Sequence, residues 1–72
     1  MFKIGDRVMI SSDNDNENYE NFRGKALIIT DIYTNSNENV FYDEGMEGMA
    51  LYEFITEDGE DVPFALYEYE VE

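Results

Sequence analysis

The sequence predicts an all-β protein whose residues 1–72 form one small five-stranded barrel. Its apolar residues fall into clusters of strand length that are separated by turn-forming residues. Tyrosine and phenylalanine, which favour strands, are common, with six and five copies. The longest apolar run, Gly24–Tyr33, holds four β-branched residues after its opening glycine and is expected to be the central strand. No helix, repeat or linker is expected.

The first strand is expected over Phe2–Ile10, where Gly5 allows a bend or bulge. Its apolar residues of one parity are Phe2, Ile4, Val8 and Ile10. A long polar loop over residues 11–22 follows, because it is rich in side chains that compete for backbone hydrogen bonds. Tyr19 and Phe22 are expected to pack the end of this loop against the barrel.

Within the central strand, the apolar run 26–29 leaves the face assignment ambiguous, and burial on both faces would explain it. We expect Leu27 and Ile29 to face the core, with a twist or bulge that brings Ile32 inward afterwards. A second polar loop is expected over Thr34–Asn39.

The next segments are a short strand at Val40–Tyr42, a turn near residue 45 and a longer strand at Met49–Thr56. The pair Asp58-Gly59 is a strong hairpin signal. The return strand is expected over Asp61–Phe64, where Pro63 confines it to a sheet edge or to its own end.

The last segment is expected to contain a 3₁₀ turn at Ala65–Tyr67 and then a terminal strand at Glu68–Glu72. This strand alternates strictly between apolar and acidic residues. Three carboxylates would then share one face of a strand, spaced about 6.7 Å apart: Glu68, Glu70 and Glu72.

The charge is strongly negative and unevenly distributed. The chain holds 18 acidic and 4 basic residues, a net charge of −14. All four bases lie in residues 1–25 with five acids, whereas residues 26–72 hold thirteen acids and no base. Such a field repels nucleic acid and anionic membranes and steers basic partners toward the protein. Solubility alone would also explain the same charge.

The composition argues against several classes of function. The chain has no cysteine and no histidine, which removes disulfides, thiol nucleophiles, the commonest general base and the commonest zinc ligands. Its paired carboxylates all fall in expected turns, where both members would be solvated, whereas acid–base catalysis needs two different environments. We therefore expect no enzymatic activity and no cofactor. Without a signal-peptide pattern or an apolar run of about 18 residues, a soluble cytoplasmic protein is expected.

The spacing Asp13-x-Asp15-x-Glu17 is similar to the start of a calcium-binding loop. Such loops need glycine at the sixth position and a bidentate glutamate at the twelfth, and these positions are Asn18 and Gly24 here. A solvated loop is the simpler interpretation, and a weak cation site is the alternative.

Two motifs carry a resemblance to a known fold. Residues 5–10 read Gly-Asp-Arg-Val-Met-Ile, and residues 23–32 begin Arg-Gly-Lys-Ala and continue as an apolar strand. This order resembles the KOW-type SH3-like barrels, and it is similar to small uncharacterised phage and prophage proteins of Gram-positive bacteria. The resemblance implies an SH3-like barrel over most of the chain. Leu27 replaces the second glycine of the KOW pattern. Many KOW modules touch RNA and are basic or mixed in charge, whereas this chain has a net charge of −14. Direct nucleic-acid binding is therefore not carried over from the resemblance.

Two functions follow as hypotheses. In the first, the protein is a non-enzymatic inhibitor from a phage or mobile element, which mimics nucleic acid and binds a basic, nucleic-acid-handling host protein. In the second, it is a general SH3-like interaction or structural module, with a groove of Tyr and Phe as its contact and its charge serving solubility. Tyr42, Tyr52 or Tyr69 would then be contact residues. The residues assigned to the acidic partner-binding face are Asp43, Glu44, Glu47, Glu53, Glu57, Asp58, Glu60, Asp61, Glu68, Glu70 and Glu72.

Overall fold

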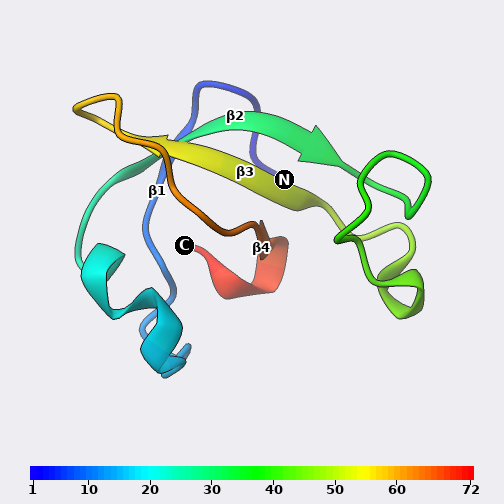
Figure 1. Cartoon of the computed structure of the whole chain (residues 1–72), viewed down its shortest axis with the longest axis horizontal. Helices are drawn as coiled ribbons and strands as arrows, with labels where there is room; N and C mark the ends of the chain where they lie inside the picture. The colour runs from blue at the N-terminus through cyan, green and yellow to red at the C-terminus, as the bar shows by residue number, and fades with distance from the viewer.

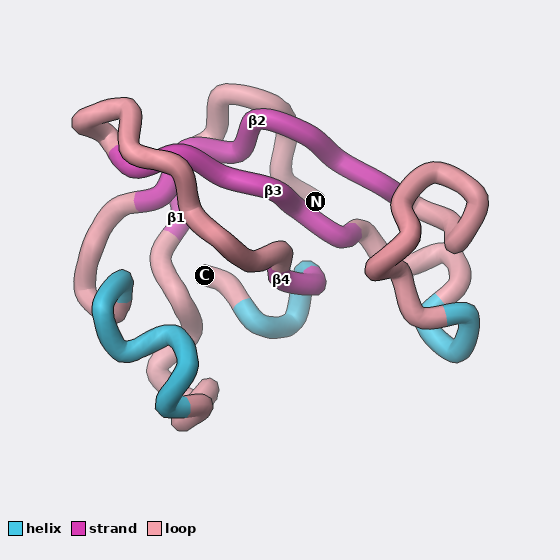
Figure 2. The backbone as a smooth tube through the Cα atoms, viewed as in Figure 1, coloured by secondary structure: helices cyan, strands magenta, loops and turns pink.

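A computed structural model describes all 72 residues and shows one curled antiparallel sheet of four strands in the order β1-β2-β3-β4 (Figure 1). The all-β prediction is confirmed at the level of fold class, but the sheet has four strands where five were predicted. Long connections separate the short strands, as the tube in Figure 2 shows. The strands are β1 (Arg7–Val8), β2 (Leu27–Tyr33), β3 (Leu51–Thr56) and β4 (Leu66–Tyr67).

The expectation of no helix was wrong, because the chain contains three short 3₁₀ helices, two in connections between strands and one after β4. Two of them begin at polar caps. The Asn16 side chain accepts a hydrogen bond from the Asn18 amide at 2.9 Å, and Asp43 accepts one from the Gly45 amide at 2.8 Å. Such side chains satisfy amides that a helix start leaves open, so a single turn forms where an irregular loop was expected. The helices are η1 (Glu17–Phe22), η2 (Glu44–Met46) and η3 (Glu68–Glu70).

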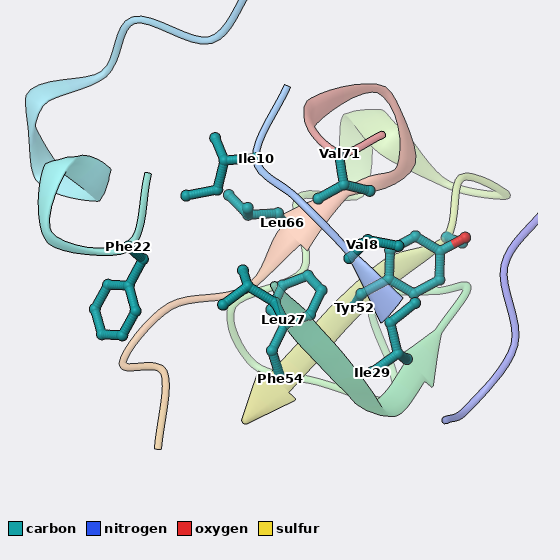
Figure 3. Close-up of a cluster of buried hydrophobic side chains, with 10 residues drawn as sticks. Val8, Ile10, Phe22, Leu27, Ile29, Tyr52, Phe54, Leu66 and Val71 are labelled. Atoms are coloured by element: carbon teal, nitrogen blue, oxygen red, sulfur yellow. The ribbon is translucent and has the colours of Figure 1, made fainter. Parts of the chain in front are cut away.

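The central strand behaves as predicted. Leu27 and Ile29 are fully buried and face the core (Figure 3). The pairing of β2 with β3 shifts register between Ile29 and Asp31, which is the predicted bulge. Beyond the bulge, Ile32 packs against the core cluster.

The core joins β2 and β3 to the polar loop after β1. Tyr52 and Phe54 of β3 and Ala50, which precedes the strand, alternate along the chain and are all buried in this core. Phe22, at the end of η1, belongs to the same core, and the Tyr19 and Phe22 rings both contact the Phe64 ring, with centroids 4.5 Å and 5.4 Å apart. The prediction that Tyr19 and Phe22 anchor this loop is confirmed.

The predicted first strand over Phe2–Ile10 is shortened to β1. Gly5 has φ +91°, a left-handed conformation that bends the chain before the strand begins. Val8 and Ile10 are buried as predicted, whereas Ile4 lies exposed because it precedes the bend.

The segment Val40–Tyr42 is not a strand. Val40 and Phe41 are 91% and 85% exposed, and only Tyr42 is buried. The Asn39 side chain accepts a hydrogen bond from the Phe41 amide, which favours a turn over extended pairing. The Tyr42 hydroxyl lies 2.6 Å and 2.5 Å from the carbonyl oxygens of Met46 and Met49, and so fixes the connection between β2 and β3.

The turn after β3 is confirmed, but the strand that should follow it is not. The Gly59 amide donates to the Thr56 carbonyl at 2.9 Å, and Gly59 has φ +85°. The predicted return strand Asp61–Phe64 is reduced to a single bridge between Ile55 and Asp61. Pro63, which lacks an amide hydrogen, lies in this unpaired stretch.

The chain end differs most from the prediction. Leu66–Tyr67, expected to be part of a 3₁₀ turn, forms β4, and the expected terminal strand at Glu68–Glu72 instead begins with the 3₁₀ helix η3. The Glu70 carboxylate accepts a hydrogen bond from the Tyr67 amide at 2.9 Å, and this contact closes the turn. Val71 then forms a bridge with Ile10, so the C-terminal segment pairs with the chain that follows β1.

Candidate functional site

The predicted acidic face is divided between opposite ends of the molecule. The turn at residues 57–61 lies at one end of the longest axis, and η2 lies at the other (Figure 1). The longest dimension is 29 Å, so the two groups lie far apart. The segment with Asp43, Glu44 and Glu47 is therefore separated by the length of the molecule from the turn with Glu57, Asp58, Glu60 and Asp61.

The three terminal glutamates do not form the evenly spaced array that the sequence predicted, because η3 turns their backbone. Each one contacts another part of this chain instead. Glu68 pairs with the Met1 amine at 3.6 Å. The second carboxylate oxygen of Glu70 accepts from the Asn14 amide group at 3.3 Å, and Glu72 accepts from the Ser12 amide at 3.4 Å. These carboxylates connect the C-terminal segment to the N-terminus and to the loop after β1.

Glu47 also has a structural contact. Its carboxylate accepts a hydrogen bond from the Ser36 amide at 3.0 Å, which ties η2 to the loop before it. Hydrogen bonds from Ser36 favour the ionised form and hold the pKa of Glu47 below its ordinary value.

We expect this depressed pKa to make the Glu47 contact sensitive to acid. A carboxylate with a lowered folded-state pKa adds stability above its unfolded pKa, and that contribution is lost as pH falls through the folded value. In an NMR pH titration, the Glu47 carboxyl should therefore titrate at lower pH than the ordinary pKa of a glutamate. In E47Q the Ser36 amide shift should lose its acid transition, and a retained transition would contradict the assignment.

The turn after β3 carries three acidic residues whose carboxylates have no partner in this chain. Glu57 pairs with Arg7 at 3.2 Å. The carboxylates of Asp58, Glu60 and Asp61 make no ion pair and accept no hydrogen bond, and all three residues are exposed. This turn is therefore a compact group of solvated carboxylates.

The tyrosines predicted as contact residues lie in different environments. Tyr42 and Tyr52 are buried and belong to the interior. Tyr69 is 65% exposed and stacks on Tyr67, with ring centroids 6.4 Å apart and an interplanar angle of 7°. Of the three, only Tyr69 is open to a partner.

An apolar groove with a volume of about 530 Å³ is the largest concave feature of the surface. β3 contributes Leu51 and Glu53 from the face opposite Tyr52. The exposed Phe41 ring and Tyr67 of β4 line it from the neighbouring segments. The volume lies within the range of about 300–1,000 Å³ that is typical of ligand sites. The full lining is Phe41, Leu51, Glu53, Val62, Pro63, Phe64, Ala65 and Tyr67.

Glu53 is the one charged residue of this lining, and the sheet fixes its position. The Tyr33 hydroxyl donates a hydrogen bond of 2.5 Å to its carboxylate. That hydrogen bond raises the pKa of Tyr33, and burial and the charges of Glu53 and Asp31 act in the same direction. Asp31 stands directly opposite Glu53 in the β2–β3 pairing.

The structure groups no three acidic side chains in the arrangement of a metal site. Asp13, Asp15 and Glu17 are exposed, and they do not converge on a common point as the calcium-loop alternative requires.

Comparison of this chain with protein-family models, with characterised proteins and with solved structures finds no match. Among the helices, none has the length and apolar character needed to cross a membrane. Function is therefore inferred from the groove, the free carboxylates and the net charge.

Proposed function

We propose that this chain is a non-enzymatic acidic module that binds a basic partner protein through the apolar groove. One observation carries the proposal: an open groove with six apolar lining residues and a fixed carboxylate lies on a protein of net charge −14. The apolar lining supplies contact area, and the charge favours and orients a cationic partner. A module of this kind needs no catalytic group and no cofactor.

Nucleic-acid mimicry is the narrower form of this proposal, with a nucleic-acid-handling host protein as partner and a phage or mobile element as source. The free carboxylates of Asp58, Glu60 and Asp61 favour it, because they form an exposed acidic group near Arg7–Glu57. The terminal glutamates no longer support it, since η3 removes their regular spacing. The alternative is a general interaction or structural module whose charge serves solubility.

We also propose that the curled four-stranded sheet belongs to the SH3-like class. The bridge between Ile10 and Val71 supports this proposal, because it brings the C-terminal segment against the continuation of β1. The Met9 and Glu72 backbones exchange two hydrogen bonds of 2.8 Å at the same place.

Two adjacent residues provide a matched test of groove binding. Phe41 lines the groove, whereas its neighbour Val40 is equally exposed and does not. The immobilised protein is incubated with host lysate, and bound proteins are quantified by mass spectrometry for wild type, F41S and V40S. Basic proteins captured by wild type should be lost with F41S and in high salt, but retained with V40S.

Two other outcomes separate the alternatives. If D58N/E60Q/D61N abolishes capture while F41S leaves it intact, the turn carries the contact and mimicry is favoured. If only neutral or acidic partners are captured, and salt does not change the capture, both groove binding of a basic partner and nucleic-acid mimicry are contradicted.

A further inference from the structure

Two carboxylates face each other across the central strands. Asp31 of β2 and Glu53 of β3 are direct partners in the antiparallel pairing, so their side chains leave the same face of the sheet. Like charges in such a pair destabilise a sheet. The ion pairs of this chain lie elsewhere, between Met1 and Glu68, Arg7 and Glu57, and Arg23 and Glu20. No cation of the chain itself offsets the repulsion.

The groove adds an apolar environment on the Glu53 side of this pair, whereas Asp31 is exposed and does not line the groove. Glu53 lines the groove beside Leu51 and Tyr67, and the Tyr33 hydroxyl fixes its carboxylate. A cation that enters the groove therefore meets a positioned acceptor and loses part of its contact with water. Charge-assisted hydrogen bonds are stronger than neutral ones, and they gain further strength where water is excluded.

We propose that the groove docks an extended segment of the basic partner, with one arginine bridging Glu53 and Asp31 and an apolar residue against Phe41 and Leu51. This inference depends on the proposed function and specifies its ligand. Alternate residues of an extended segment face the same side, so the arginine and the apolar residue stand two positions apart. Arginine fits better than lysine, because its planar group can bond two carboxylates at once.

Other occupants fit the charges less well. A second copy of this chain would bring −14 against −14, and two of its four bases, Arg7 and Arg23, are already paired with its own acids. A nucleic acid would place phosphates against Glu53 and Asp31. A basic segment instead neutralises a pair that the free protein leaves uncompensated.

The test uses the full-length protein and a labelled synthetic peptide with the core Leu-Ser-Arg-Ser-Leu between glycine–serine ends. Fluorescence anisotropy should show that wild type binds this peptide more tightly than peptides with lysine or uncharged citrulline in place of arginine. E53Q should weaken binding about tenfold or more, as expected for loss of a charge-assisted contact. D31N should weaken it as well, and chemical unfolding should show both variants at least as stable as wild type.

Matched variants decide between the possible outcomes. D58N removes the same charge from the turn and should leave peptide affinity nearly unchanged. Equal losses for D58N and E53Q would overturn the arginine site and leave the acidic module standing. F41S should weaken the binding of the arginine peptide and of the citrulline peptide to the same degree. If F41S leaves the affinity of both peptides unchanged, groove binding itself is contradicted. A calcium titration followed by NMR gives a further check. If the shifts are confined to Asp31 and Glu53 and the peptide does not bind, the site binds a metal ion, and the inference is overturned.

Discussion

Replacing Leu27 with alanine is expected to remove most of the stability of the fold. Leu27 is 0% exposed, pairs with Val8 on one side and Thr56 on the other, and lies in the core cluster. Truncating a buried leucine in this way costs about 2–5 kcal/mol of unfolding free energy. A core in a chain of this length without disulfides rarely supplies more than about 3–5 kcal/mol. A large unfolded fraction is therefore expected without denaturant.

Urea unfolding followed by circular dichroism measures this effect, and V40A serves as the control. Val40 is 91% exposed, so its truncation should change stability by no more than about 0.5 kcal/mol. An L27A midpoint equal to that of V40A would show that Leu27 does not form the centre of the core.

The features predicted correctly from the sequence depend on local pattern. The apolar β-branched run defines β2 and its inward residues Leu27 and Ile29. The pair Asp58-Gly59 defines the turn after β3, because Gly59 adopts the left-handed conformation that this turn requires. In both places the neighbouring residues alone favour one structure.

The features missed depend on contacts between distant residues. Glu68–Glu72 alternates as a strand would, but the Glu70 carboxylate caps the Tyr67 amide and its other oxygen contacts Asn14, 56 residues away. Such contacts outweigh a weak strand preference. Phe41 was missed for a local reason instead, because the side chain of Asn39, two residues earlier, accepts a hydrogen bond from its amide and favours a turn over a strand.

The groove could not be predicted because it also depends on contacts between distant residues. Its lining comes from residues 41, 51, 53, 62–65 and 67, and only the folded sheet brings these segments together. One signal was present in the sequence: the apolar residues Val40 and Phe41 lie between the polar loop 34–39 and the acidic residues that follow Tyr42. The opposition of Asp31 and Glu53 required the register, including the bulge after Ile29.

Raising the salt concentration is expected to stabilise the free protein strongly. Its 18 acids and 4 bases lie within a molecule of 29 × 24 × 20 Å. Two like charges about 10 Å apart repel by about 0.4 kcal/mol in water, and the many pairs sum to roughly a few kcal/mol. The Debye length falls from about 30 Å at 0.01 M to about 3 Å at 1 M, so salt removes most of this cost. Thermal unfolding between these concentrations should show a large rise in Tm with sodium chloride.

A charge-reversed variant separates screening of repulsion from a general effect of salt. D58K/E60K/D61K changes the net charge from −14 to −8 at exposed side chains that make no ion pair and accept no hydrogen bond. It should be more stable than wild type at low salt and gain less from added salt. The affinity for a basic partner should instead fall as salt is added, because the same ions screen the attraction between the two proteins. If the variant and wild type gain equally, the −14 charge does not limit stability, and a partner that neutralises it would not stabilise the fold by relieving repulsion.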